Sequence, residues 1–295
     1  MKIIYKNKTS NEVYINNIDK VKILLEKLSL LLDFDLNLKV YFVKEKNKIS
    51  AVAAGVIKKD KKWFILYIYD CAFDCNQNNL DTVLFHEFAH LYDIYHASQN
   101  EEFNYINDKL YLKSYENLIK RTGFLYWTEF FAHYKCFKNN FSNPNSAETF
   151  LQLVKHYKKI VTKKKEIEES ILKEAKNIKV IKEQLYDLVE LIGEFQYCSA
   201  GYIASLSFRK NLYDYSEKHK NKKEFKEVSE IIYNLVKLVF KMIHGTYGKH
   251  LGKRLYKIGS YINDKMFSKF NVRMFIYKST IAYEYVCTKE EIIEK

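Results

Sequence analysis

The sequence predicts an α+β fold, in which a small mixed sheet near the N-terminus is followed by a mainly helical C-terminal region. Strand-like alternation is concentrated before residue 70, whereas helical spacing of apolar residues dominates after it. The 295 residues include one proline and eight glycines, a composition that suits long helices and few tight loops. With 47% hydrophobic and 16% aromatic residues, the chain is expected to fold around one or two sizeable cores.

The first elements are expected to be a helix, three strands and a second helix. Apolar residues at helical spacing predict a helix over residues 17–34. Strands are expected at 38–43, 51–57 and 63–69, and the last two are joined by a basic turn. A helix-compatible apolar run over residues 80–95 comes next.

Helices are expected to make up most of the chain after residue 107. Two are predicted in the N-terminal part, over residues 108–120 and 124–138. Asn139–Asn145, which contains Pro144, then reads as a boundary between domains at 1–140 and 141–295. Further helices are expected over 147–189, 188–212 and onward to about residue 240. Half of the glycines fall within residues 243–259, a pattern that indicates a loop.

The most informative stretch is His86-Glu87-Phe88-Ala89-His90, an HExxH motif inside the apolar run. Positions i and i+4 of a helix lie one above the other, so the two imidazoles can meet at one point, as a tetrahedral Zn²⁺ site requires. Glu87 follows the first histidine, where its carboxylate can reach a water molecule on the metal. The motif therefore predicts two ligands and a general base.

A third ligand must come from elsewhere in the chain. Glu129 lies in the aromatic segment YWTEFFAH, where Ala132 shares its helix face and leaves room for a neighbouring helix. His96 is an alternative because its spacing from His86 matches a second class of HExxH proteins, although Asp93 stands where that class needs a glycine. Asp93 itself could orient a ligating imidazole.

The pair of motifs HEFAHLYD and WTEFFA resembles zincin metallopeptidases of the gluzincin type, and most of all the anthrax lethal-factor-like group. The resemblance covers residues 50–135. It implies zincin-type active-site helices, zinc held by His86, His90 and Glu129, and a zinc-dependent endopeptidase with Glu87 as general base. It also implies an edge strand that pairs with extended substrate, for which we favour residues 63–69. The region 141–295 would complete the substrate cleft.

Zincins also use a tyrosine or histidine from outside the metal helices to stabilise the oxyanion. In this sequence Tyr247 and His244, in the glycine-rich segment, are the catalytic candidates for that role. His133, four residues after Glu129, is another candidate for the pocket.

Composition narrows the class of partner and the compartment. A net charge of +13 permits binding to nucleic acid, an anionic membrane or an acidic protein, but no zinc-finger spacing, RNP-like motif or phosphate loop is visible in the sequence. Five irregularly spaced cysteines indicate free thiols in a reducing cytoplasm. Neither a signal peptide nor an apolar stretch of about 18 residues is evident. We therefore expect a cytoplasmic protein that acts on a protein or peptide substrate and has no membrane span.

Two other functions fit part of the pattern. The first is a catalytically inactive zincin-fold binding module that acts through protein partners, against which the intact Glu87 argues. The second is a nucleic-acid-associated protein with structural zinc, which would normally need four protein ligands rather than three.

Overall fold

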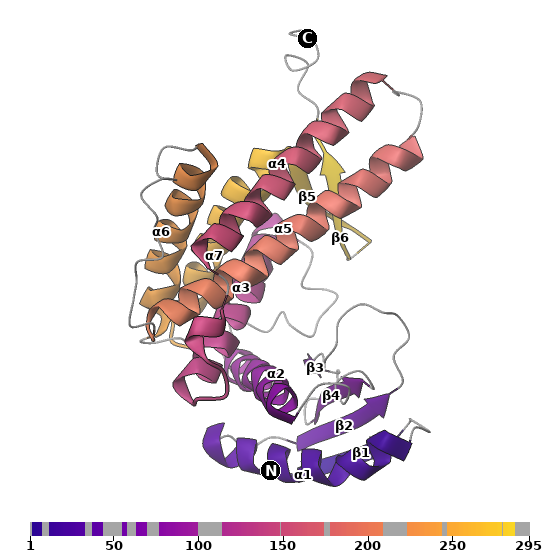
Figure 1. Cartoon of the computed structure of the whole chain (residues 1–295), viewed down its shortest axis with the longest axis vertical. Helices are drawn as coiled ribbons and strands as arrows, with labels where there is room; N and C mark the ends of the chain where they lie inside the picture. Colours follow the sequence, from indigo (N-terminus) through magenta and orange to yellow (C-terminus); the bar gives the residue numbers. More distant parts are fainter. Residues whose placement is uncertain are drawn as a thin grey trace. The chain divides into compact units, whose positions relative to one another are not determined.

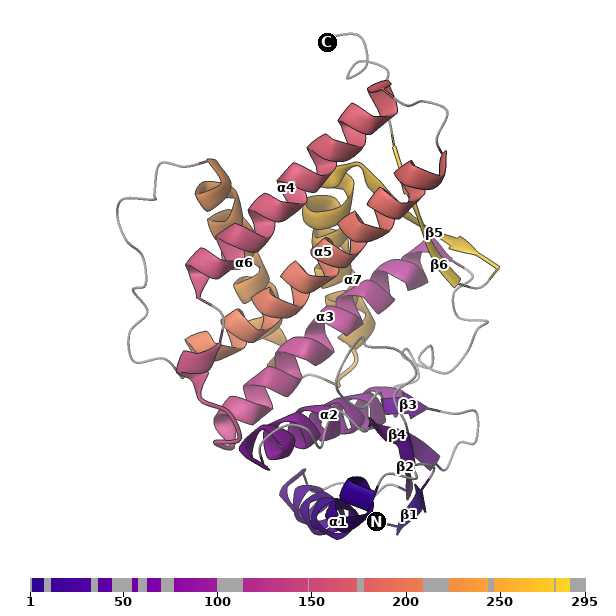
Figure 2. The same ribbon diagram turned by 45° about the vertical axis from the view of Figure 1, so that its right-hand side comes forward.

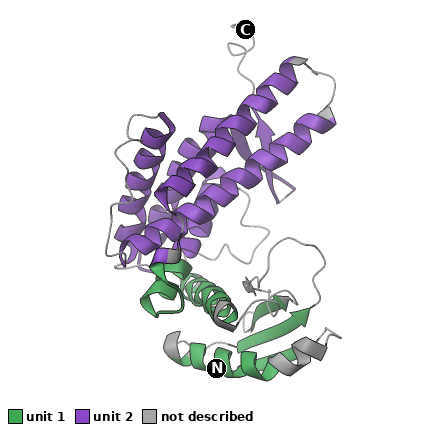
Figure 3. Ribbon diagram, in the orientation of Figure 1, with its two compact units in different colours: residues 1–108, 131–144 green, residues 109–130, 145–295 purple. Residues whose placement is uncertain are grey.

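The computed structural model of the chain is drawn in Figure 1 and Figure 2, and its two compact units are coloured in Figure 3. Unit 1 comprises residues 1–108 and 131–144, and unit 2 comprises residues 109–130 and 145–295. The described part of the chain is mostly helical, with one small sheet near each end. The division into functional domains at residue 140 stays a prediction. The structure describes residues 2–7, 12–32, 37–43, 55–57, 63–69, 77–99, 114–147, 149–173, 178–208, 223–243, 247–278 and 280–286.

Unit 1 contains a small mixed sheet, as the sequence predicted, but it has four strands, and the first of them, over residues 2–7, was not expected. Its strands lie in the order β1-β2-β4-β3, and β1, β2 and β4 are parallel whereas β3 is antiparallel to β4. The strands are β1 (Lys2–Asn7), β2 (Asn37–Val43), β3 (Gly55–Ile57) and β4 (Trp63–Tyr69).

The strand β4 is internal, so the expectation that residues 63–69 form the edge is wrong. Hydrogen-bonded strands flank it on both sides. Phe64, Ile65, Leu66 and Ile68 are all buried, a near-continuous apolar run that is typical of a strand covered on both faces. Among the described strands, the edges are β1 and the short β3.

Two helices accompany this sheet. The helix α1 (Glu12–Leu32) connects β1 to β2, since parallel neighbours need a crossover, and it buries Val21, Leu25 and Leu28 at helical spacing. The helix α2 (Gln77–Ser98) contacts both α1 and β3. Figure 2 shows both helices to the left of the strands. Both predicted helices are confirmed, with earlier starts.

A single helix, α3 (Tyr115–Lys138), replaces the two helices expected over residues 108–120 and 124–138. The Ser114 hydroxyl accepts a hydrogen bond from the backbone N–H of Asn117 at 3.2 Å, which caps the first turn. The helix then continues through the point where a break was expected.

The reason for this continuity is the packing of Gly123 within unit 2. A Cβ atom added to Gly123 would lie 1.9 Å from the carbonyl oxygen of Leu255, in α7 (Leu251–Ile262). A Cβ atom added to Gly259 would lie equally close to the carbonyl oxygen of Ile119. The two glycines therefore let the backbones of α3 and α7 meet, and Gly123 serves packing rather than a turn.

The end of α3 lies in unit 1 and is closed by a Schellman motif. The backbone N–H of Phe141 donates to the carbonyl of Cys136 at 3.0 Å, and that of Asn140 donates to the carbonyl of Phe137 at 3.3 Å. Asn140 has φ of 59°, the left-handed conformation that this motif needs. The Thr82 hydroxyl of α2 donates to the carbonyl of Phe141, so the turn is tied to α2.

In unit 2, α4 (Phe150–Lys173) and α5 (Ile178–Leu206) lie side by side as a long antiparallel pair (Figure 1). A capping box starts α4: the N–H of Gln152 donates to the Thr149 hydroxyl, and the N–H of Thr149 donates to the Gln152 side chain. Helical structure is confirmed here, but the expected boundary near residue 188 is wrong, because α5 runs through it.

The helix α6 (Lys223–Ile243) precedes the glycine-rich segment, where the expected loop is wrong from residue 251 onward. That part forms α7, which buries Leu255, Ile258 and Ile262 at a spacing of three to four residues. Glycine content suggested a loop, but the apolar periodicity and the close crossing with α3 determine the helix.

A hairpin near the C-terminus was not expected from the sequence. After α7 come a π-helical turn (Asn263–Phe267) and a 3₁₀ turn (Ser268–Phe270), followed by β5 (Val272–Tyr277) and β6 (Thr280–Tyr285). The two strands pair in antiparallel fashion.

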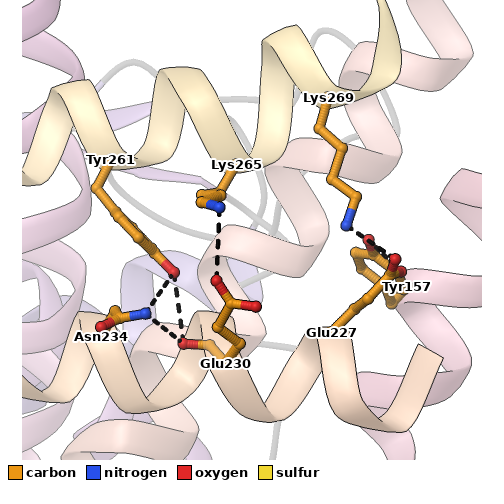
Figure 4. A network of polar contacts seen from close by, with 7 residues as sticks. All are labelled: Tyr157, Glu227, Glu230, Asn234, Tyr261, Lys265 and Lys269. Atoms are coloured by element: carbon orange, nitrogen blue, oxygen red, sulfur yellow. Dashed lines mark hydrogen bonds and ion pairs between the residues drawn. The ribbon is translucent and has the colours of Figure 1, made fainter. Parts of the chain in front are cut away.

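Polar contacts join three helical segments of unit 2, as Figure 4 shows. The buried Tyr157 of α4 donates to a Glu227 carboxylate oxygen at 2.9 Å, and Lys269 pairs with the same carboxylate at 3.1 Å. Lys265 pairs with Glu230 at 3.5 Å. These contacts tie α4 and α6 to the turns after α7. Burial and the neighbouring glutamates raise the pKa of Tyr157, so its hydroxyl stays protonated and acts as the donor.

Neither Cys136 nor Cys198 forms a disulfide, and Cys71, Cys75 and Cys287 lie outside the described residues, so the expectation for the five cysteines together stays a prediction. Among the helices of the described residues, none is long and apolar enough to span a membrane.

Candidate metal centre

The HExxH motif lies in the middle of α2, where apolar side chains hold the helix in the core of unit 1. Leu84, Phe85, Phe88 and Leu91 are fully buried at helical spacing. His90 is 9% exposed, whereas His86 and Glu87 are half-buried. The motif is therefore held on a packed helix, with its first histidine and its glutamate still reached by solvent.

The two histidines turn the same ring atom toward each other. Nε2 of His86 and Nε2 of His90 are 3.0 Å apart, and the ring planes meet at 85°. Zinc binds imidazole nitrogen at about 2.0–2.1 Å, so two nitrogens on one tetrahedral ion lie about 3.3 Å apart. The histidine pair fits that requirement closely.

Glu129 supplies the third side chain of the group. One carboxylate oxygen of Glu129 and one nitrogen each of His86 and His90 all lie within 4.8 Å of one another. This group is wider than a bound ion requires by at most about 1.5 Å, a gap that a change in the Glu129 side-chain torsions can close. The three side chains therefore form a group that could hold a metal ion.

The placement of Glu129 follows from how the end of α3 packs on α2. Glu129 stands at the boundary between the two units, on a helix that runs through that boundary without a break. In unit 1, the ring of Phe131 stacks on Tyr92 with centroids 5.9 Å apart, and the Cys136 thiol lies 3.9 Å from the carbonyl of Thr82. These contacts hold the last two turns of α3 beside the motif.

The charge of Glu87 influences a side chain on the facing helix α3. Burial raises the pKa of the Cys136 thiol to about 12, and the negative charge of Glu87 adds to that shift. The Glu87 carboxylate is therefore close enough to α3 to act on it, while its half-buried side chain keeps access to solvent. A carboxylate in this position can exchange a proton with a water molecule beside the histidines.

His96, the alternative third ligand, is not in the group that could hold a metal. Its ring lies against Tyr92, with centroids 4.2 Å apart. Burial lowers the pKa of His96, and the charge of Lys135 lowers it further, so the neutral ring is favoured. Lys135 extends its ammonium over the rings of Tyr92 and Phe131, at 5.1 and 5.2 Å from their centroids.

Asp93 is completely buried, which is unusual for a carboxylate and requires compensation by cations or hydrogen-bond donors. The positive charge of Lys135 supplies part of this compensation. Burial lowers the pKa of Lys135 and repulsion by Lys138 lowers it further, whereas the charge of Asp93 raises it. The charge interaction between Asp93 and Lys135 was not foreseen from the sequence. The role of Asp93 in orienting an imidazole stays a prediction.

The other candidates are placed as follows. The ring of His133 lies beside that of His86, with centroids 4.7 Å apart, so His133 does reach the surroundings of the group. Tyr247 is half-buried in unit 2, just before α7. His244 lies outside the described residues. The assignment of Tyr247 or His244 to the oxyanion stays a prediction.

Comparisons of the chain with protein families, with curated proteins and with solved structures find no match.

Proposed function

We propose that the protein is a zinc-dependent endopeptidase. The observation that supports this most directly is the convergence of ligand atoms from His86, His90 and Glu129 within 4.8 Å. Two neutral imidazoles and one carboxylate form a donor set that zinc accepts in catalytic sites. Glu87 follows the first histidine and is half-buried. Because it can act as a general base, it favours a catalytic zinc site over a structural one.

His86, His90 and Glu129 would hold the ion. When bound, zinc supplies a Lewis acid that polarises a carbonyl group and acidifies a water molecule. With three protein ligands in the group found among the described residues, a tetrahedral ion would keep one position open for water or substrate.

Glu87 would carry the protons. Its carboxylate accepts a proton from the attacking water and then delivers that proton to the nitrogen of the cleaved peptide bond. The residue cannot easily serve as a ligand, because its position directly after His86 turns it about 100° away around the helix.

The substrate would be a protein or peptide. An internal β4 cannot offer its backbone to substrate, so any pairing with an extended peptide would use a described edge, β1 or β3.

The test combines metal content with hydrolysis. The full chain is loaded with zinc, freed of loosely held metal, and analysed by elemental mass spectrometry; one zinc per chain is expected. Unfolded casein is then offered with and without a chelator, and zinc is restored afterwards. Hydrolysis that disappears with the chelator and returns with zinc supports the proposal. Failure to bind any transition metal overturns it, and zinc bound without any hydrolysis replaces it with a binding module.

A further inference from the structure

A second histidine cluster lies in unit 2, between α4 and α5. Nε2 of His156 is 4.0 Å from the Sγ atom of Cys198, and Nδ1 of the same ring is 4.0 Å from a carboxylate oxygen of Glu194. Glu194 and Cys198 are four residues apart on α5 and so lie on one face of that helix, opposite His156 on α4. The metal centre does not use any of the three.

The arrangement suits proton transfer better than metal binding. A metal ion would need one nitrogen of His156 to converge with both the thiol and the carboxylate. Here the two ring nitrogens face different partners, and the three side chains do not form a group that could hold a metal. Thiol, imidazole and carboxylate in this order are the parts of an activated cysteine: a nucleophile, a base, and a group that orients the base.

We propose that Cys198 is a peroxide-reactive thiol, which His156 deprotonates and Glu194 supports as a positioning residue. His156 accepts the thiol proton at Nε2, and the thiolate attacks one oxygen of hydrogen peroxide or an alkyl hydroperoxide. The O–O bond breaks, the other oxygen leaves with the proton from His156, and water or an alcohol is released. Sulfur is oxidised by two electrons to a sulfenic acid, and the peroxide is reduced.

Access to the thiol differs between the two described cysteines. Cys198 is partly exposed, whereas Cys136 is 2% exposed and burial raises its pKa to about 12. Beside the cluster, Glu194 has a side chain that is 50% exposed, and a Cβ atom built on Gly193 would meet nothing within 4 Å. A small peroxide can therefore approach from solvent, and Cys136 provides an internal reference in the same molecule.

The experiment measures the reaction of each cysteine by mass spectrometry. Full-length protein is treated with hydrogen peroxide and dimedone at pH 7, and the adducts on the peptides that contain Cys198 and Cys136 are followed over time. The variants are His156→Gln, His156→Ala and Glu194→Gln. Glu190→Gln removes the same charge from an exposed position one turn away on α5 and is the matched control.

A free thiol is only about 3% ionised at pH 7, so a base can raise its rate by up to about 30-fold. We expect Cys198 to react faster than Cys136, His156→Gln to slow Cys198 at least about fivefold, and Glu194→Gln to slow it at least about twofold. Glu190→Gln should react like the unchanged protein. Free imidazole should restore part of the rate to His156→Ala, which a merely structural histidine would not explain.

Two results would overturn the proposal. One is a wild-type Cys198 that reacts no faster than Cys136. The other is a rate that His156→Gln and Glu194→Gln leave unchanged. Circular dichroism checks the folding of each variant, and if His156→Gln does not fold, the exposed position of Glu194 lets Glu194→Gln decide alone.

Discussion

His86 and His90 turn their Nε2 atoms toward one point, 3.0 Å apart, whereas His156 directs its two ring nitrogens toward two different side chains. The first arrangement combines two rings from one helix, with spacing i and i+4, and a carboxylate from a second helix. The second uses one ring between two residues of a neighbouring helix. Both contain the same kinds of group, a histidine and a glutamate.

The difference shows that the direction of the ring nitrogens determines what a histidine can do. Two ring nitrogens that converge can both coordinate one cation, because their lone pairs point to the same position. Two ring nitrogens that point to different partners suit proton transfer. One nitrogen can accept a proton, while the partner of the other orients the ring.

The largest effect is expected at Glu87. Glu87→Gln should slow hydrolysis of casein by at least about 100-fold, because the amide cannot accept the proton from water. Zinc content should stay at the level of the unchanged protein, since Glu87 is not proposed as a ligand. Parallel measurements of turnover and bound zinc check both parts, and near-normal turnover would remove Glu87 from the mechanism.

The third ligand gives the next contrast. Glu129→Ala should weaken zinc binding by more than about 100-fold, because even residues that only support a ligand contribute about 10- to 100-fold. His96→Ala, the matched variant on α2, should leave affinity nearly unchanged. Competition with a coloured chelator measures both. If the order were reversed, His96 would belong to the site and Glu129 would not.

Substitutions at two glycines of unit 2 should change the stability of the fold without changing the reacting groups. Gly123→Ala should lower the free energy of unfolding by about 1–3 kcal/mol, because the new Cβ would overlap the Leu255 carbonyl. Gly193→Ala should raise it by about 0.5–1 kcal/mol, since its Cβ enters open space on a helix. Denaturant titrations monitored by circular dichroism give both values. Gly193→Ala should also leave the Cys198 rate unchanged, and a change there would mean that helix stability, not the base, controls the thiol.

The smallest effect is expected on the reaction of Cys198 when zinc is removed. Removing zinc with a chelator should abolish hydrolysis and leave the rate of Cys198 labelling unchanged, because His156 and its partners are not metal ligands. The same sample can be divided between the two assays. A Cys198 rate that follows the zinc content would show that the two clusters are one system.

The HExxH motif is local, so its geometry could be predicted from the sequence: one helix places His86 and His90 together whatever surrounds it. Glu129 could also be selected, because Ala132 and the aromatic flanks indicated a helix that packs closely. The cluster of His156, Glu194 and Cys198 could not be foreseen. Its members lie on two helices about 40 residues apart, and no spacing in the sequence states which face of α4 meets which face of α5.

Glycine was the most misleading residue. In the segment 243–259 it indicated a loop, but Gly259 lies in α7 and, together with Gly123 of α3, lets the two helix backbones meet. A single sequence does not distinguish a glycine that bends the chain from one that admits a neighbouring backbone, because both need only the absence of a Cβ atom. The prediction of the edge strand was wrong for a related reason. Whether β4 has a neighbour on both sides depends on the order of the strands in space, which the sequence does not state.

The division of unit 1 along the chain has a consequence for synthesis on the ribosome. Its first 108 residues emerge early, yet residues 131–144 also belong to it, and the 22 residues between them belong to unit 2. Domains tend to fold as they leave the ribosome, N-terminal part first. Until residue 144 has emerged, α2 of the nascent chain therefore lacks its packing partner, the end of α3. A product released before that point would carry the histidine pair with an incomplete core, and the proposed activity would begin only once translation had passed it.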